Sequence, residues 1–410
     1  MKDRRNFLGF GLATGAAATL THCASDPAAK SGGGAAAALE DEGPDQLGKA
    51  VTAYGERSTF EKTARLVPDT KTPATASSRT PLADTYGIIT PNALHFERHH
   101  AGVPKIDPAE HKLLIHGMVD RPLVFTLDDL KRLPSVSRVH FVECAGNTGG
   151  EWGPKTAPDV TRSHGLASCS EWTGVSLKLL LEEAGVQKTA QWLLAEGADA
   201  CKMARSVPIA KALDDAFIAY AQNGEAIRPE QGYPLRLLLP GYEGNINVKW
   251  LRRIKVSDQP FYTKDETSKY TELLADGKAM IFTLPMDAKS VITRPSGGQK
   301  LKGPGAYEIT GLAWSGRGKI TKVEVSADGG ATWKPALLQD PVLTKAFTRF
   351  RLPWTWDGNE VQLVSRCWDE TGYQQPTREE LVAARGMNSN YHCNVLKSWK
   401  IAADGSVTNA

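Results

Sequence analysis

The chain has 410 residues, of which 41% are hydrophobic, 23% charged and 8% aromatic. This profile is typical of a globular protein with more than one domain, and it excludes a fibrous or wholly disordered chain. The formal net charge is +3, from 49 basic and 46 acidic residues, so the composition gives no support to a nucleic-acid-binding protein.

The first 25 residues have the pattern of an export signal. Arg4 and Arg5 form a twin-arginine pair, and a mildly apolar run rich in Gly and Ala follows from Phe7 to Leu20. That run is shorter than the ~20 apolar residues that cross a bilayer. The pattern predicts a removable twin-arginine signal, a periplasmic location and no membrane anchor. A chance Arg-Arg pair in a cytosolic protein is the alternative, and the residues before Cys23 leave its lipidation open.

Residues 26–84 differ in composition from the rest of the chain. They are rich in Ala, Gly, Pro, Ser and charged residues, with three glycines at 32–34 followed by four alanines. Such a segment buries little apolar surface, so the composition predicts a flexible linker or arm.

The six cysteines are Cys23, Cys144, Cys169, Cys201, Cys367 and Cys393. No two of them have the CxxC spacing of a zinc ribbon or a thioredoxin-like pair. Removal of the signal leaves an odd number, so at least one thiol of an exported protein stays free or binds a ligand. Cys169, Cys367 and Cys393 lie in apolar or strand-like contexts and are expected in the core. Cys201 lies near Asp199 and is a weaker candidate for lining a site.

Residues 85–275 are expected to form a mixed α+β domain. Strand-like apolar runs occur at 113–117, 139–142, 190–195 and 234–239. Short helices are predicted at 126–131 and 176–184, with Thr126 and Ser176 as their caps. The elements lack the regular alternation of a doubly wound sheet, and no GxGxxG or GxxxxGK[ST] motif supports a nucleotide cofactor.

Residues 280–402 have a different pattern, and no internal repeat is present. Strand-like runs occur at 307–314, 320–326, 347–352 and 361–368. Asp328-Gly329-Gly330 provides a turn signal after the second run. Strands of this length and spacing predict an immunoglobulin-like sandwich.

The densest group of chemically active side chains is the histidine cluster, residues 94–104. It places His95, Arg98, His99 and His100 within six positions. Three interpretations remain open from these residues alone: a zinc site, a site for a phosphate-bearing cofactor, or a structural segment.

Cys144 stands at the end of an apolar strand and is followed by Ala145 and Gly146. Small residues at this position allow a backbone to approach a ligand closely. A cysteine in this context is otherwise a small buried hydrophobic residue, and thiolate chemistry would need a lowered pKa or a metal.

Five motifs taken together resemble the sulfite oxidase family in order and spacing. They are Phe96-x-Arg98-x-His100, Cys144-Ala145-Gly146-Asn147, Trp172-x-Gly174, Gly232-Tyr233-Pro234-Leu235-Arg236 and Val248-Lys249-Trp250-Leu251. The stretch Ser326–Trp333 is similar to the dimerisation domain of that family. The resemblance covers roughly residues 87–401, and within the family residues 87–100 look like the catalytic subunits of bacterial sulfane dehydrogenases of the thiosulfate-oxidising system.

The resemblance implies a molybdenum–molybdopterin cofactor, one per chain, with Cys144 as the thiolate ligand of the metal. A soft thiolate suits a soft, redox-active metal, and the metal in turn holds the cysteine deprotonated. The implied pterin-binding residues are Phe96, Arg98, His99, His100, Asp199, Gln231, Arg236, Asn247, Val248 and Lys249. Arg236 and Lys249 would hold the pterin phosphate; the alternative for these two is a solvated ion pair at a strand end.

The resemblance also implies an oxyanion pocket in which Arg98, Tyr270 and Arg385 act beside Cys144. The chain departs from the sulfite oxidases at several positions around that pocket. Thr148 and Gly149 replace two arginines, Arg162 stands near the position of a tryptophan, and Gln231 replaces a histidine. Losing one charged contact to an oxyanion costs about 1.5–3 kcal/mol. The expectation is a wider, less cationic pocket that suits a bulkier sulfur substrate.

We therefore expect a periplasmic sulfane dehydrogenase that oxidises sulfane sulfur on a carrier protein by oxo transfer. The resemblance implies a homodimer and a c-type cytochrome as electron acceptor, since no haem-attachment motif is present. No nucleic acid or membrane partner is expected.

Three alternatives remain open. The first is a sulfite dehydrogenase that acts on free sulfite with cytochrome c. The second is a zinc hydrolase built on His95, His99, His100 and Cys144. The third is a secreted binding module whose function depends on the sandwich domain alone.

Overall fold

The computed structural model describes residues 48–69, 72–153 and 157–410. The chain divides into two units, Met1–Thr59 and Phe60–Ala410, and only residues 48–59 of the first unit are described. The predicted export signal, with Arg4, Arg5 and Cys23, lies outside the described residues.

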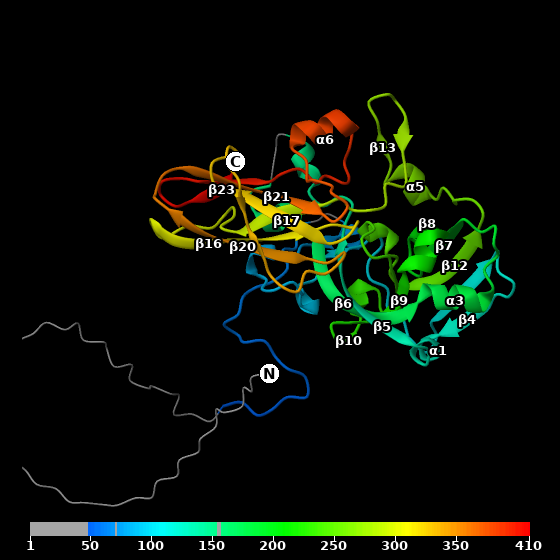
Figure 1. The fold of residues 1–410 in the computed structure, drawn as a ribbon. Helices are drawn as coiled ribbons and strands as arrows, with labels where there is room; N and C mark the ends of the chain where they lie inside the picture. The colour runs from blue at the N-terminus through cyan, green and yellow to red at the C-terminus, as the bar shows by residue number, and fades with distance from the viewer. Residues whose placement is uncertain (1–47, 70–71, 154–156) are drawn as a thin grey trace, which may run out of the picture. The chain divides into compact units, whose positions relative to one another are not determined.

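The second unit has two lobes (Figure 1), and the first lobe contains two sheets of five strands each. One sheet has the order β4-β3-β12-β7-β8, and in it β12 runs parallel to β3 and antiparallel to β7. Its strands are β3 (Lys112–Gly117), β4 (Leu123–Thr126), β7 (Trp192–Gly197), β8 (Ala204–Pro208) and β12 (Leu251–Ser257). The other sheet has the order β10-β9-β6-β5, with β11 paired to β9. Its strands are β5 (Ser135–Glu143), β6 (Ala167–Ser176), β9 (Phe217–Gln222), β10 (Glu225–Ala226) and β11 (Arg236–Leu238).

Short helices of the first lobe follow the predicted pattern with one difference. Its helices are α1 (Leu127–Lys131), α2 (Val160–His164), α3 (Leu177–Ala184), α4 (Ile209–Asp214) and α5 (Lys264–Ser268). Thr126 caps α1 in a reciprocal capping box with Asp129, as its position predicts. Ser176 precedes α3 but makes no capping hydrogen bond, so that prediction was wrong. The helix is held instead by its apolar face, since Leu177, Leu180 and Leu181 are buried.

The second lobe is a sandwich of two antiparallel sheets, with the orders β15-β16-β20-β19 and β18-β17-β21-β22-β23. The first sheet consists of β15 (Lys289–Arg294), β16 (Gly305–Trp314), β19 (Leu337–Leu338) and β20 (Thr348–Trp356). The second consists of β17 (Ile320–Ser326), β18 (Lys334–Pro335), β21 (Val361–Asp369), β22 (Ser398–Ile401) and β23 (Val407–Asn409). Gly329 and Gly330 turn the chain after β17 with positive φ angles of 71° and 99°. The mixed first lobe followed by an all-β sandwich confirms the predicted fold class.

The two lobes share one hydrophobic core. Phe141 and Cys169 of the first lobe belong to the same buried cluster as Trp314, Phe350 and Trp399 of the second. The ring centroids of Phe141 and Phe347 lie 6.4 Å apart and are stacked. The predicted domain division between residues 275 and 280 therefore stays a prediction, because residues 60–410 pack as one compact unit.

The end of the predicted linker is folded. Ser77–Ser78 (β1) pairs antiparallel with Glu97–Arg98 (β2), and Leu82 is fully buried in the shared core. Residues 77–84, which the composition assigned to the linker, are therefore part of the folded second unit. Composition missed this because main-chain pairing and one buried leucine hold a segment that has few other apolar residues.

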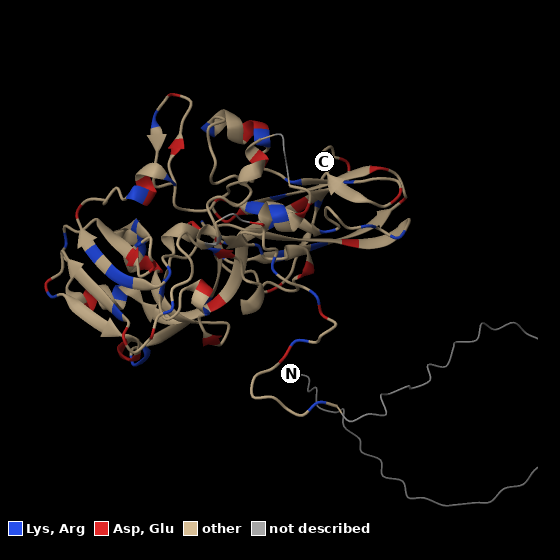
Figure 2. Cartoon of the chain, turned by 180° about the vertical axis from the view of Figure 1, so that it is seen from behind, with Lys and Arg blue, Asp and Glu red and all other residues tan. Residues whose placement is uncertain are grey.

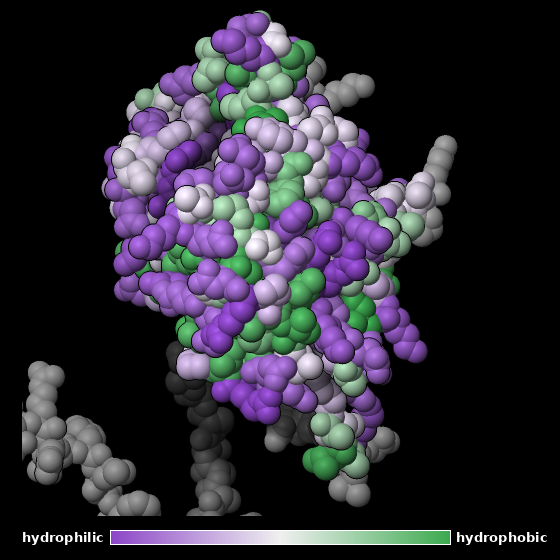
Figure 3. Space-filling view, turned by 90° about the vertical axis from the view of Figure 1, so that its right-hand side faces the viewer, coloured by the Kyte–Doolittle hydropathy of each residue, from purple (hydrophilic) through white to green (hydrophobic). Residues whose placement is uncertain are grey.

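A hairpin and a helix project from the same side of the two lobes (Figure 1). The hairpin is formed by Glu272–Leu273 (β13) and Ala279–Met280 (β14), and the helix is α6 (Arg378–Arg385). Basic and acidic residues alternate along the ribbon of both lobes in Figure 2, and neither sign dominates one lobe. On the face seen in Figure 3, hydrophilic side chains surround small apolar patches. Within the described residues, no helix combines the length and apolarity needed to span a bilayer.

Candidate active site

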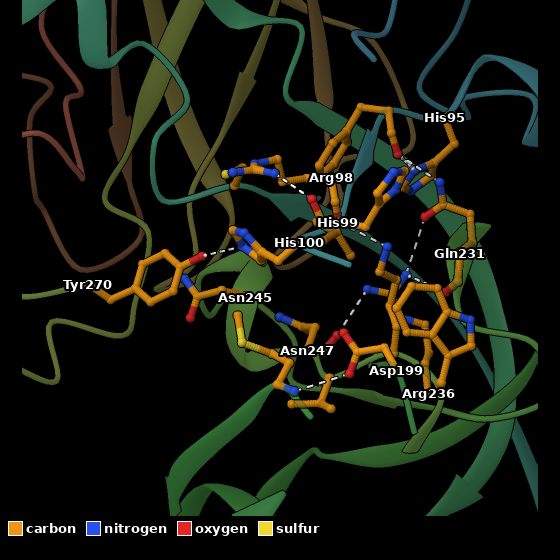
Figure 4. A pocket seen from close by; sticks show the side chains of 18 residues that line it. His95, Arg98, His99, His100, Asp199, Gln231, Arg236, Asn245, Asn247 and Tyr270 are labelled. Carbon is orange, nitrogen blue, oxygen red and sulfur yellow. Dashed lines mark hydrogen bonds between the residues drawn. The ribbon is translucent and has the colours of Figure 1, made fainter. Parts of the chain in front are cut away.

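A cavity of about 650 Å³, including its open mouth, lies in the first lobe against the end of β5 (Figure 4). It is lined by His95, Phe96, Arg98, His99, His100, Val142, Cys144, Asp199, Met203, Gln231, Arg236, Gly244, Asn245, Asn247, Val248, Lys249, Trp250 and Tyr270. All eleven residues predicted to bind the cofactor are in this set, together with Tyr270. The structure thus brings together side chains that are spread over some 170 positions of the sequence.

The histidine cluster enters the cavity from strand β2 and the residues around it. The His95 ring is buried, lies 5.3 Å from the Phe96 ring and meets the Trp172 ring edge-on. Burial lowers the pKa of His95 to about 3 and that of His100 to about 4, so both rings are neutral near pH 7. The cluster is therefore a packed wall of the cavity rather than a solvated loop.

Two cations, the buried Arg236 and the half-buried Lys249, face the cavity without an ion-pair partner among the described residues. Arg236, on β11, donates to the carbonyl oxygens of Gln231 (3.1 Å) and Asn247 (3.2 Å). Lys249 Nζ donates to the carbonyl oxygens of Arg98 (3.0 Å) and Glu230 (2.9 Å). Burial lowers the pKa of Arg236 to about 9 and that of Lys249 to about 7. These two residues are not a solvated ion pair, and they can compensate a buried anion.

Gln231 connects the cations to the histidine cluster. Its side-chain amide nitrogen donates to the carbonyl oxygen of Phe96 at 2.7 Å. Gln231, Arg236 and Asp199 lie on one side of the cavity in Figure 4, whereas Tyr270 and His100 lie on the other. The cavity therefore has a cationic end, and its opposite end is bordered by the phenol and an imidazole.

Cys144 is placed by main-chain contacts around the end of β5. Its N–H donates to the carbonyl oxygen of Leu166 at 2.9 Å, and a Cβ atom at Gly244 would lie 2.8 Å from the carbonyl oxygen of Glu143. Glycine at 244 thus permits a close approach of two chain segments. Burial raises the pKa of the Cys144 thiol, while the nearby charge of Arg98 opposes that shift. A bound metal would hold this sulfur as a thiolate.

Tyr270 lines the same cavity as Cys144 and belongs to the segment that joins α5 to β13. Its hydroxyl lies 3.4 Å from His100 Nε2, and the guanidinium of Arg205 lies 4.9 Å from the centre of its ring. Burial raises the pKa of Tyr270, so the phenol is protonated and can donate a hydrogen bond.

Arg385 is not among the residues that line the cavity. Its guanidinium forms an ion pair with Glu272 and donates to the carbonyl oxygen of His392 at 3.3 Å. Glu272 is 3% exposed, so the charge of Arg385 is neutralised within the protein. Arg385 therefore lies outside the cavity lining, and its contact with the substrate stays a prediction.

Two of the positions that depart from the sulfite oxidase pattern, Gly149 and Arg162, are not among the residues that line the cavity. A Cβ atom at Gly149 would lie 2.8 Å from the carbonyl oxygen of Asn390, so main chain fills the space that glycine was expected to open. Arg162 forms an ion pair with Asp159 and lines a separate surface depression, not the cavity. Spacing could not show either result, because both depend on segments that are distant in sequence.

Sequence motifs missed several residues around the cavity. Asn245 lies two positions before the predicted Asn247, so proximity in sequence was its only signal. Arg79 follows β1, its side chain makes no hydrogen bond or ion pair in the described chain, and its charge interacts with that of Cys144. Nothing in the sequence pointed to Arg79 because it lies in the segment assigned to the linker.

The other cysteines follow their predicted contexts. Cys169, Cys367 and Cys393 are buried, and all five described cysteines are free thiols. Cys201 Sγ lies 2.7 Å from a carboxylate oxygen of Asp199 but does not line the cavity. Among the described residues, no group of three or more His, Cys, Asp or Glu side chains is placed to hold a metal ion. The zinc hydrolase alternative therefore has no ligand set there.

Comparisons with known proteins agree on one family. The model described as oxidoreductase molybdopterin binding domain matches residues 100–264, and the Mo-co oxidoreductase dimerisation domain matches residues 280–398. The chain is 32% identical to human mitochondrial sulfite oxidase over 75% of its own length and 61% of that protein. It is 32% identical to the NADH nitrate reductase of Volvox carteri, of which it spans 38%.

A solved structure is more similar. The sulfane dehydrogenase SoxCD from Paracoccus pantotrophus shares 46% sequence identity with this chain and superposes with a TM-score of 0.87. The match covers 89% of this chain and 96% of the other. The likeness therefore includes both lobes and the segments that form the cavity.

Proposed function

The chain belongs to the sulfite oxidase family of molybdopterin oxidoreductases, and on this premise we propose that it is a periplasmic sulfane dehydrogenase. Family membership makes it a molybdenum-dependent sulfur oxidoreductase. The proposed substrate is sulfane sulfur bound to a cysteine of a carrier protein, and the proposed acceptor is a c-type cytochrome. The observation that carries the proposal is the 46% identity to a sulfane dehydrogenase over 96% of that chain.

The cavity fits the molybdopterin cofactor. Arg236 and Lys249 are cations without a carboxylate partner in the described chain, as a phosphate-binding site requires. At another part of the cavity Cys144 presents a half-buried sulfur. Its pKa is raised, so a bound metal would be needed to hold it as a thiolate. Cys144 would hold the molybdenum, and the other predicted residues would hold the pterin. When bound, the cofactor supplies a centre that transfers oxygen and accepts two electrons.

The side chains next to Cys144 bind and orient the sulfur substrate. Arg98 offers a positive charge to an anionic sulfur group, and the protonated Tyr270 hydroxyl offers a hydrogen-bond donor. Donors fixed within a buried site stabilise developing charge more strongly than water does. In each oxidation, water supplies one oxygen to the terminal sulfur, two protons leave, and two electrons pass singly to the cytochrome.

The sandwich lobe and the N-terminus support further parts of the proposal. The match of the sandwich lobe to a dimerisation domain favours a homodimer. The twin-arginine pair favours export of the folded, cofactor-loaded protein. The alternative is a sulfite dehydrogenase, which the retained Arg98 and the similarity to sulfite oxidases favour. The two functions share the cofactor and differ in the substrate that reaches it.

The test uses the exported chain, its Cys144→Ser variant and a Cys201→Ser control. Molybdenum content, released pterin and reduction of cytochrome c are measured with glutathione persulfide and with sulfite as probes. We expect about one molybdenum per chain, greater kcat/KM for the persulfide, and loss of both activities in Cys144→Ser only. Oxidation of sulfite without oxidation of persulfide would establish the alternative instead.

A further inference from the structure

A segment of the second lobe, residues 389–393, lies directly on the loop that carries Cys144. The N–H of His392 donates to the carbonyl oxygen of Ala145 at 2.9 Å. Trp152 Nε1 donates to the carbonyl oxygen of Tyr391 at 3.3 Å, and the Thr148 hydroxyl donates to that of Cys393. Because these bonds come from three positions of the loop, the two segments are fixed against each other.

The Tyr391 ring and the Cys144 sulfur both lie close to Gly146. From the place that a Cβ atom would take at Gly146, Cys144 Sγ and Tyr391 Cδ1 each lie 4.0 Å away. The ring centres of Tyr391 and Tyr270 are 5.3 Å apart and tilted by 43°. Tyr270 lines the cavity, and Tyr391 packs against it from just outside the lining residues, so the two rings form an aromatic pair at the edge of the cavity.

The position of Tyr391 is also fixed from its other side. Its N–H donates to Glu272 Oε1 at 3.1 Å, and the same carboxylate pairs with Arg385. Glu272 belongs to the β13 hairpin of the first lobe, so both lobes hold this residue.

Gly149 is what allows the segment to sit there. A Cβ atom at this position would meet the carbonyl oxygen of Asn390 at 2.8 Å, a contact that real Cβ atoms do not make. The contacted atom belongs to the main chain, and the next residue, Tyr391, is held by hydrogen bonds to Trp152 and Glu272. Moving Asn390 would therefore cost free energy. A side chain at position 149 would therefore displace Asn390 and, with it, Tyr391.

We propose that the Tyr391 ring, packed against Tyr270 at the edge of the cavity, contacts the bound substrate and, with Tyr270, selects sulfur compounds that carry an organic group over small free oxyanions. The aromatic pair offers polarisable ring faces and edges, which make favourable contacts with methylene groups and divalent sulfur. It adds no positive charge, so it gives a free oxyanion no corresponding advantage. The proposal rests on the proposed function and names the feature of the cavity that sets its substrate class.

The test compares the holoenzyme with the Tyr391→Phe, Tyr391→Leu and Gly149→Ala variants, using glutathione persulfide and sulfite as probes. Tyr391→Leu retains an apolar side chain but removes the ring, and Tyr391→Phe retains the ring. We expect Tyr391→Leu to lower kcat/KM for the persulfide by about tenfold, mainly through KM, with less than about twofold change for sulfite. Tyr391→Phe should keep the wild-type preference, and Gly149→Ala should lose it.

Molybdenum and pterin content, measured on every variant, separate a folding defect from a change in selectivity. Met387→Ala is the control, since this exposed side chain lies close to the same segment. Equal losses for both probes, or no loss in Tyr391→Leu, would overturn the role of Tyr391 while leaving the proposed function intact. A wild-type protein that oxidises sulfite but not persulfide would overturn the role of Tyr391 and the proposed function together. This result is obtained before any variant is compared.

Discussion

Glu143, the residue immediately before Cys144, forms a buried ion pair with Lys289 of the second lobe, with 2.5 Å between Oε1 and Nζ. Both side chains are at most 1% exposed. Trp314 Nε1 donates to the other carboxylate oxygen of Glu143 at 2.7 Å. The strand that delivers the proposed metal ligand is therefore held by charges and hydrogen bonds from the sandwich lobe.

Removing Lys289 should destabilise the protein strongly. Lys289→Met leaves the Glu143 carboxylate buried without its cation, which costs about 3–5 kcal/mol of unfolding free energy. Urea unfolding measures the change, and molybdenum content should fall with it. Lys300→Met is the matched control, because Lys300 and Asp404 form an exposed pair and the expected change is below about 1 kcal/mol. Similar small changes in both variants would contradict the structural role of the buried pair.

Loss of either cavity cation should weaken cofactor retention. Arg236→Met and Lys249→Met each remove a charged contact to the proposed phosphate, at a cost of about 1.5–3 kcal/mol. That corresponds to roughly one to two decades of affinity. Pterin fluorescence of the purified protein measures retention, and Arg138→Met serves as an exposed-charge control. Full pterin content in both cavity variants would place the phosphate elsewhere.

The cofactor-free chain should become more stable as pH rises above 7. Lys249 has a pKa of about 7 in the folded protein, lowered from 10.5 by burial. Between these values the unfolded chain binds a proton that the folded chain lacks, so unfolding free energy rises with pH over this range. A phosphate beside Lys249 would keep it protonated and remove the rise. Urea unfolding at pH 7–9 of the loaded, cofactor-free and Lys249→Met proteins measures this, and only the cofactor-free chain should show the increase from this group.

Arg385 and Glu272 should behave as a coupled pair. If their ion pair positions Tyr391, Arg385→Met and Glu272→Gln should raise KM for the persulfide to a similar extent, and the double variant should lose little more. A double-mutant cycle measures the coupling, expected at about 0.5–3 kcal/mol. Additive effects, with KM for sulfite raised by Arg385→Met alone, would instead support a direct contact of Arg385 with the oxyanion.

Local sequence patterns predicted much of the fold. Runs of apolar residues with turn signals between them predicted strands β3, β16, β17 and β21, because alternation and turn chemistry act over a few residues. The Thr126 cap followed from residues three positions apart. The motifs around Phe96, Cys144 and Lys249 selected side chains that the fold places in one cavity.

Tertiary structure alone decided the rest. The sequence shows that Gly149 lacks a side chain, but only packing shows that the main chain of Asn390 occupies the space. The same holds for Leu82, whose burial depends on the opposite lobe, and for Arg385, whose charge is neutralised by Glu272. Such contacts join residues more than 100 positions apart. They form only when the tertiary fold brings those distant segments together, so no local pattern encodes them. Sequence by itself thus predicted the family, the residues that line the cavity and many of the elements, whereas the fold decided which groups surround that cavity.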